Sequence, residues 1–297
     1  MAIKTILIIG KTGQLASALL EYVKGFPDFS VIARGKEELD ILDGNSIESV
    51  IREAKPDIVI NTASWQIMAQ CEASPRQALA MNFVAVRNLA AVCKDNNASL
   101  VHFSSDAVFS GHQDEFRAED DLPDPLQMFG LSKLAGEYAV LAVYPKGAYI
   151  LRTCGLYGGL TGSPAKCNFV LNMLKEAAES KEAIEVSSEQ IVSPTYAVDL
   201  AKATYGLLAL NPAPGVYHLV NEGCCSWADF AKEIFALAEV KKEVRGVDRG
   251  GYSGNADRPR FSALKNTKAK ALGVALPNWQ DGLKRYFDFL RANGGLK

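Results

Sequence analysis

The chain has 297 residues, 48% of them hydrophobic, which is enough to bury a large core and to form about two domains. Its 32 Lys and Arg residues nearly balance 34 Asp and Glu residues, for a net charge of -2. This balance argues against broad attachment to nucleic acid or an anionic membrane, although a local basic pocket for a phosphate is compatible with it. No apolar run reaches the roughly 18 residues of a membrane span, and the first residues lack the long apolar region of an export signal. We therefore expect a globular cytoplasmic protein with no nucleic-acid or membrane partner.

The cysteines and histidines give no pattern typical of a metal site. The 6 cysteines contain no Cys-x-x-Cys spacing, and the 3 histidines lie far apart in the sequence. In a chain of this size without an export signal, buried reduced thiols are favoured over disulfides. We predict free thiols and no bound metal.

Short β-rich runs alternate with helical patterns through the first half of the chain. The expected strands are 4–9, 29–33, 57–60, 100–103 and 149–151, and the expected helices are 13–24, 46–54, 75–95 and 130–143. The strands are rich in β-branched residues without alternation, which indicates burial on both faces. This pattern predicts an α/β fold with a Rossmann-like, doubly wound parallel sheet and right-handed crossovers.

The pattern changes beyond Arg152. A glycine-rich loop over 155–164 precedes expected helices at 169–179, 197–209, 227–238 and 281–291, and a Gly/Arg-rich loop is expected over 245–260. We predict a dinucleotide-binding domain at 1–152, to which 190–209 returns, and a smaller C-terminal substrate lobe at 153–189 and 210–297. The ligand site is expected in a cleft between them, at the carboxyl ends of the strands.

The loop after the first strand has the spacing Gly10-x-x-Gly13-x-x-Ala16. Gly10 permits the turn, and Gly13 lets a pyrophosphate approach the backbone. Ala16 is small enough for the following helix to pack on the strand. Unpaired N–H groups at that helix N-terminus favour phosphate oxygens. The loop therefore predicts dinucleotide binding by Gly10, Thr12, Gly13, Gln14 and Leu15.

The end of the second strand bears on the choice of coenzyme. An Asp or Glu at this place would hold the ribose hydroxyl of NAD, whereas this chain has Arg34 and Lys36. Because a guanidinium grips a 2′-phosphate with two hydrogen bonds, NADP(H) is favoured and NAD(H) is the alternative. The alternative interpretation is that Arg34 and Lys36 are solvated charges of a surface loop. Asp40 and Ile41 either border the adenine or belong to an acidic turn that caps the next helix.

Further motifs follow in a characteristic order along nearly the whole chain. They are Asn61-Thr-Ala-Ser64, Asn82, Ser104-Ser-Asp-Ala-Val-Phe109, Phe129-Gly-Leu-Ser-Lys133, Arg152-Thr153, Ser193-Pro-Thr-Tyr196 and Arg258-Pro-Arg-Phe-Ser-Ala-Leu264. The set resembles the extended short-chain dehydrogenase/reductase superfamily, and within it the dTDP-4-dehydrorhamnose reductase family. The resemblance implies a Rossmann domain, a nucleotide-sugar lobe, and hydride transfer from NAD(P)H to the C4 ketone of a dTDP-linked 6-deoxyhexose. It also implies coenzyme contacts at Asn61, Ala63, Ser64, Asn82 and Lys133.

In this superfamily a Tyr hydroxyl donates the proton, a Lys four residues later lowers the pKa of that Tyr and holds the nicotinamide ribose, and a Ser or Thr binds the carbonyl. Lys133 and Ser105 match the last two roles. Phe129 occupies the Tyr position and has no hydroxyl. A general acid contributes about 10²–10⁴-fold, so its loss is expected to raise the barrier by about 3–5 kcal/mol. Asp106, or a water bound to Ser105, is the possible substitute donor, whereas Tyr138 is expected to face away.

The expected substrate side also departs from the family pattern. Ala107 and Gly155 stand where the resemblance implies aromatic residues that pack on the sugar, so a wider and less aromatic pocket is expected. Asn168 is expected near the nucleotide diphosphate. Arg258 and Arg260 suit a pyrophosphate or an acidic partner, or they are plain surface arginines.

Two functions remain open from the sequence. The first is reduction of a nucleotide-sugar ketone that depends on NADP(H). The second is a catalytically weak or inactive coenzyme-bound regulatory or scaffold protein, acting as a homodimer or with a protein partner. Phe129, Ala107 and Gly155 favour the second function, whereas Lys133 and the glycine loop fit both.

Overall fold

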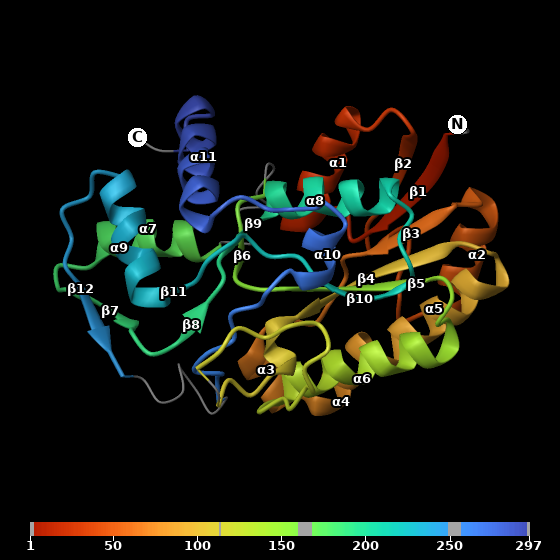
Figure 1. Ribbon diagram of the computed structural model, residues 1–297, viewed down its shortest axis with the longest axis horizontal. Helices are drawn as coiled ribbons and strands as arrows, with labels where there is room; N and C mark the ends of the chain where they lie inside the picture. Colours follow the sequence, from red (N-terminus) through yellow and green to blue (C-terminus); the bar gives the residue numbers. More distant parts are fainter. Residues whose placement is uncertain (1–2, 113, 160–167, 249–256, 296–297) are drawn as a thin grey trace.

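A six-stranded parallel sheet forms the centre of the computed structural model, which describes residues 3–112, 114–159, 168–248 and 257–295 (Figure 1). Its strand order is β10-β5-β4-β3-β1-β2. The strands are β1 (Lys4–Ile9), β2 (Phe29–Arg34), β3 (Ile58–Asn61), β4 (Ser99–Ser105), β5 (Ala148–Thr153) and β10 (Gly215–His218). The chain reverses its direction across the sheet between β1 and β3, which is the place where such sheets bind ligands. The predicted Rossmann-like fold is confirmed.

Helices cover both faces of the sheet. Along β1, Ile6 and Ile8 pack on one side with Leu19, while Leu7 and Ile9 pack on the other. This alternation explains the continuous apolar strand, because successive side chains enter two different cores. The first core is covered by α1 (Gln14–Tyr22) and α8 (Ala197–Ala209), and the second by α2 (Gly44–Ala54), α5 (Ala85–Asp95) and α6 (Met128–Val143).

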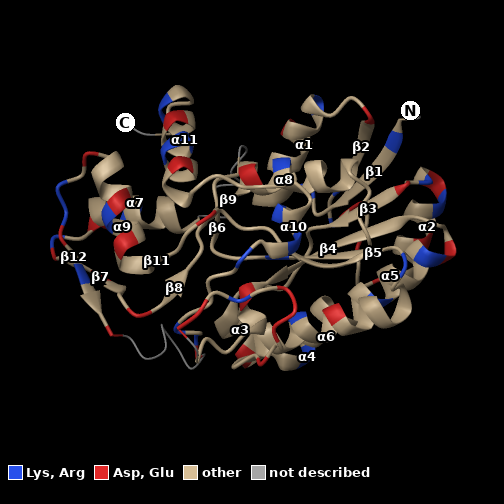
Figure 2. Cartoon of the chain, viewed as in Figure 1, with Lys and Arg blue, Asp and Glu red and all other residues tan. Residues whose placement is uncertain are grey.

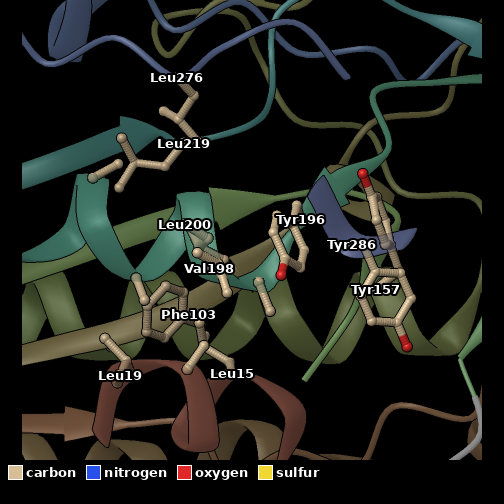
Figure 3. Packing of buried hydrophobic residues seen from close by; sticks show 14 of the residues in the cluster. Leu15, Leu19, Phe103, Tyr157, Tyr196, Val198, Leu200, Leu219, Leu276 and Tyr286 are labelled. Atoms are coloured by element: carbon tan, nitrogen blue, oxygen red, sulfur yellow. The ribbon is translucent and has the colours of Figure 1, made fainter. Parts of the chain in front are cut away.

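The C-terminal lobe lies beside the sheet and shares the first core with it (Figure 1). Tyr157 stacks on Tyr196 with ring centroids 5.7 Å apart, and Tyr286 packs against both rings (Figure 3). The lobe contains α7 (Phe169–Glu179), α9 (Trp227–Leu237) and α11 (Trp279–Ala292), with the paired strands β7 (Ile184–Ser187) and β12 (Val244–Val247), β8 (Ile191–Val192) and β11 (Cys225–Ser226), and β6 (Leu156–Tyr157) and β9 (Thr195–Tyr196).

Three expectations about the elements need correction. Strand β10 belongs to the main sheet, so 210–297 is not wholly part of the smaller lobe; its four residues follow a proline-rich loop and carry too short an apolar run to be recognised. The expected loop at 245–260 begins within strand β12. The expected helix at 75–95 is divided into α4 (Pro75–Leu79), a π-helical turn and α5. Residues 160–167 and 249–256, which include Cys167, lie outside the described ranges, and the division into two domains stays a prediction.

Charges of both signs are mixed along the surface helices. Figure 2 shows Lys and Arg beside Asp and Glu on α2, α9 and α11. Among the described residues, no helix has the length and apolarity to cross a membrane, and no group of His, Cys, Asp and Glu is arranged to hold a metal ion. The cysteines within the described ranges are free thiols, as predicted.

Candidate coenzyme and active site

The glycine loop forms a tight cradle between β1 and α1. Gly10 has a φ of +92°, and a Cβ there would lie 2.7 Å from Thr62 Oγ1. Gly13 is the N-cap residue of α1 and provides no side-chain cap, so the N–H groups of the first turn remain available to a ligand. Leu15 is buried beneath the loop, and Gln14 Oε1 is buried without a hydrogen-bond partner. This geometry fits a pyrophosphate at the predicted place.

Positive charge lies beside this cradle at the end of β2. Arg34 is half-buried and Lys36 is exposed. Lys11, which the sequence reasoning did not single out, pairs with Glu38 at 2.5 Å. The Gly35 amide and then Lys11 lower the pKa of Glu38.

The two acidic-turn residues have structural roles. Asp40 Oδ1 accepts a hydrogen bond from the Leu42 amide, and Ile41 is 3% exposed within the second core. Asp43 caps α2 by accepting from the Asn45 amide. These contacts belong to a capping turn, and the expected position of Asp40 and Ile41 beside the adenine stays a prediction.

The loop after β3 is held by two buried asparagines. Asn61 Oδ1 accepts from the Ala63 amide at 3.0 Å. Asn82 accepts from Ser64 Oγ and the Trp65 amide, and its Nδ2 donates to the Trp65 carbonyl and Ser132 Oγ. Because these four bonds use its full hydrogen-bonding capacity, Asn82 positions the loop. Its expected contact with the coenzyme stays a prediction.

Lys133 on α6 is 2% exposed, so its ammonium is poorly solvated. Its Nζ lies 2.5 Å from the Phe103 carbonyl and 3.2 Å from His102 Nε2. Burial lowers the pKa of Lys133 to about 8, while Glu137 one turn later acts in the opposite direction. Glu137 itself is held by Arg152 at 2.7 Å. The sequence reasoning missed His102, although a His within an otherwise apolar buried strand is an informative polar exception.

Ser105, the last residue of β4, lies beside Asp106. Ser105 Oγ donates to Asp106 Oδ1 at 2.8 Å and accepts from the Ala107 amide at 3.1 Å. Asp106 Oδ2 accepts from Cys154 Sγ at 3.0 Å and from Ser262 Oγ at 2.5 Å. Neighbouring donors thus contact both carboxylate oxygens of Asp106. The geometry therefore opposes Asp106 as the substitute donor.

Phe129 lies in an apolar cluster that has no hydroxyl. It is 8% exposed and packs with Ala107, Cys71 and Ala78, with Trp65 and Met68 against them. Gly130 brings α6 close to this turn, because a Cβ there would collide with the Ala107 carbonyl. Tyr138 is 58% exposed, as expected for a side chain that faces away.

An indole ring lies beside Gly155, which is one of the two positions where the resemblance implies an aromatic residue. A Cβ at Gly155 would lie 3.3 Å from the ring of Trp227, which packs on Phe169 with ring centroids 4.5 Å apart. The expectation of a wider and less aromatic pocket is not tested by this contact and stays a prediction. The sequence held no signal for this packing, because Trp227 comes from a distant helix.

The other residues expected to bind substrate have partners within the chain. Asn168 caps α7 through the Leu171 amide and donates to Tyr286 Oη. Arg260 pairs with Glu189 at 2.9 Å on the surface, and Arg258 is half-buried. Their predicted contacts with a nucleotide diphosphate are not tested by these arrangements.

Known proteins resemble the chain over almost its whole length. The dTDP-4-dehydrorhamnose reductase of Streptomyces griseus is 35% identical over 97% of this chain and 95% of its own length. The spore coat polysaccharide biosynthesis protein SpsK of Bacillus subtilis is 34% identical over 95% of this chain and 96% of its own.

Solved structures agree with these similarities. The dTDP-4-dehydrorhamnose reductase of Bacillus anthracis, solved in complex with NADP, matches with a TM-score of 0.90 at 33% identity, over 97% of this chain and 99% of that one. The UDP-glucose 4-epimerase of Thermus thermophilus matches with a TM-score of 0.80 at 19% identity, which shows the shared fold alone. The model of the RmlD substrate binding domain matches residues 4–292. The chain therefore belongs to the RmlD substrate-binding domain family.

Proposed function

We propose that the chain binds NADPH and reduces the 4-keto group of a dTDP-linked 6-deoxyhexose in the cytoplasm, with a slow proton-transfer step. Relatives named for this reduction span nearly the whole chain, and one neighbour was solved with NADP. The observation that carries the proposal is the preserved cradle of Gly10 and Gly13 together with a buried Lys133. NADPH, when bound, supplies the hydride.

The residues of this chain account for binding and orientation. The N-terminus of α1 suits the pyrophosphate, and Arg34 with Lys36 suits a 2′-phosphate. Lys133 Nζ contacts His102 and the Phe103 carbonyl, and one further N–H remains that could bind the nicotinamide ribose. Ser105 suits the substrate carbonyl once its hydroxyl turns away from Asp106.

Proton delivery is the step that the chain does not supply in the usual way. Phe129 has no hydroxyl, and Asp106 already accepts three hydrogen bonds. A water beside Ser105 is left as the donor. We expect turnover about 10²–10⁴-fold below that of a Tyr-containing relative.

The test combines binding with turnover. NADPH binding is measured by calorimetry, and NADPH oxidation is followed with a panel of dTDP- and UDP-linked 4-keto sugars, with analysis of the sugar product. Slow reduction of a dTDP-linked ketone supports the proposal. Binding of NADPH without turnover of any ketone would contradict it.

A second function is favoured specifically by the apolar surroundings of Phe129. In that case the chain is a coenzyme-bound regulatory protein with little catalysis. Affinity purification of the chain separates the two proposals, because a regulator brings down one partner in stoichiometric amount and an independent enzyme does not.

A further inference from the structure

Three buried side chains form a hydrogen-bonded row below the expected nicotinamide position. Asn61 and His102 are each 1% exposed, and Lys133 is 2% exposed. Asn61 Nδ2 lies 3.2 Å from His102 Nδ1, and His102 Nε2 lies 3.2 Å from Lys133 Nζ. The row joins the end of β3 and the middle of β4 to α6.

The orientation of Asn61 is fixed by the backbone. Its side chain meets the Ala63 amide, which can only donate, at 3.0 Å. The carbonyl oxygen of Asn61 must face that amide, so its NH₂ group faces His102. Turning the amide over would set its NH₂ group against the Ala63 N–H, which leaves two donors facing each other.

This orientation fixes the tautomer of His102. An NH₂ group only donates, so His102 Nδ1 must accept and carry no proton. In the neutral ring the proton then lies on Nε2, which faces Lys133 Nζ. An ammonium has only N–H donors, whereas a neutral amine has a lone pair that can accept from Nε2–H.

If either His102 or Lys133 carries a positive charge, at least one pair of N–H donors in the row from Ala63 to Lys133 must face each other. The arrangement with a neutral ring and a neutral amine has no such pair. We propose that Asn61 and His102 are positioning residues that hold Lys133 as a neutral amine, with the ring proton of His102 on Nε2. The inference deepens the proposed function, because it concerns the Lys of that same site, but its readout requires neither coenzyme nor turnover.

One neighbouring charge, Glu137, raises the pKa of Lys133 and so acts against this arrangement. Glu137, on the same helix as Lys133, is bound by Arg152 of β5. Burial holds the pKa of His102 well below its usual range, so the ring is neutral. Burial also lowers the pKa of Lys133, in the same direction as the hydrogen-bond order.

A second buried histidine provides a matched internal control. His218 Nδ1 lies 3.1 Å from the Arg117 carbonyl, and its Nε2 lies 3.4 Å from Arg152 Nη1. Because a carbonyl accepts and a guanidinium donates, His218 must carry its proton on Nδ1. The two buried rings are therefore expected to be opposite tautomers.

The test is a two-bond ¹⁵N–¹H correlation spectrum of the full-length chain labelled at histidine, with His102→Gln and His218→Gln for assignment. We expect the Nε2–H pattern for His102 and the Nδ1–H pattern for His218 at neutral pH. An Nδ1–H or cationic pattern for His102 would overturn the proposal, even if the chain reduces a sugar nucleotide.

The variant Asn61→Asp tests whether the NH₂ group of Asn61 fixes the tautomer of His102. An aspartate presents only acceptor oxygens, so we expect His102 to move its proton to Nδ1 and Lys133 to become charged, seen in the ¹³Cε shift of labelled lysine. Lys133→Arg assigns that signal, and His218 should keep its tautomer. An unchanged His102 tautomer in a folded Asn61→Asp chain would also overturn the proposal. Should the variant not fold, the wild-type spectrum decides alone.

Discussion

The coenzyme half and the donor half of the site meet on α6 but differ in their chemistry. Around Lys133 the side chains of Asn61, His102 and Asn82 are buried and hydrogen-bonded. One turn earlier, the side chain of Phe129 packs among apolar side chains and itself carries no hydroxyl. Binding and proton donation are therefore separable in this chain, because the elements for binding are kept and the usual donor is absent.

The largest effect is expected from returning a hydroxyl to the donor half. Phe129→Tyr should raise turnover of a dTDP-linked 4-keto sugar by about 10²–10⁴-fold, because it supplies a general acid beside Lys133. Phe129→Leu is the control and should give no gain. Equal rates for Phe129→Tyr and the wild type would mean that the site differs by more than one missing proton donor.

The next largest effect is expected from a substitution in the coenzyme half of the site, which should lower the affinity for NADPH. Gly10→Ala introduces a Cβ 2.7 Å from Thr62 Oγ1 at a φ of +92°. We expect the free energy of unfolding to fall by about 1–3 kcal/mol and NADPH affinity to fall with it. Gly44→Ala, where nothing lies within 4 Å of the added Cβ, is the matched control. Calorimetric titration measures the affinity, and thermal melting measures the stability. A Gly10→Ala chain that binds NADPH normally would show that this loop does not hold the coenzyme.

Lys133→Met removes the buried amine while it keeps the length of the side chain. The pKa of Lys133 is lowered from 10.5 to about 8, mainly by burial. The folded chain therefore binds fewer protons than the unfolded chain between these values, and stability rises with pH there. Relative to Lys133→Met, the wild type should gain about 3 kcal/mol or more as the pH rises to 10.5, and the rise should begin below pH 8, because the hydrogen-bond order at His102 also disfavours the charged amine. Denaturant unfolding across this pH range measures the free energy of unfolding of both chains. If the two free energies change in parallel with pH, the amine of Lys133 is not desolvated.

The smallest effect concerns the choice of coenzyme. Arg34→Gln should weaken NADPH binding by about tenfold and leave NADH binding unchanged, because a charge-assisted contact to the 2′-phosphate is lost. Arg52→Gln, on the exposed face of α2, is the control. Equal losses for both coenzymes would mean that Arg34 does not face the 2′-phosphate.

The fold could be predicted because its signals are local. The apolar strands and the Gly10 loop each carry their pattern within a few residues. Strand β10 could not be found in this way, since four edge residues make a weak pattern. The site was predicted at Lys133 and Ser105 through ordered motifs. Trp227 beside Gly155 was missed because that contact joins residues far apart in the chain.

The most direct test of the separation between binding and proton donation is a calorimetric titration of the wild-type chain with NADPH. We predict saturable one-to-one binding that is weakened by Gly10→Ala and unaffected by Phe129→Tyr. Absence of saturation at millimolar NADPH, or binding that Gly10→Ala leaves intact, would contradict it.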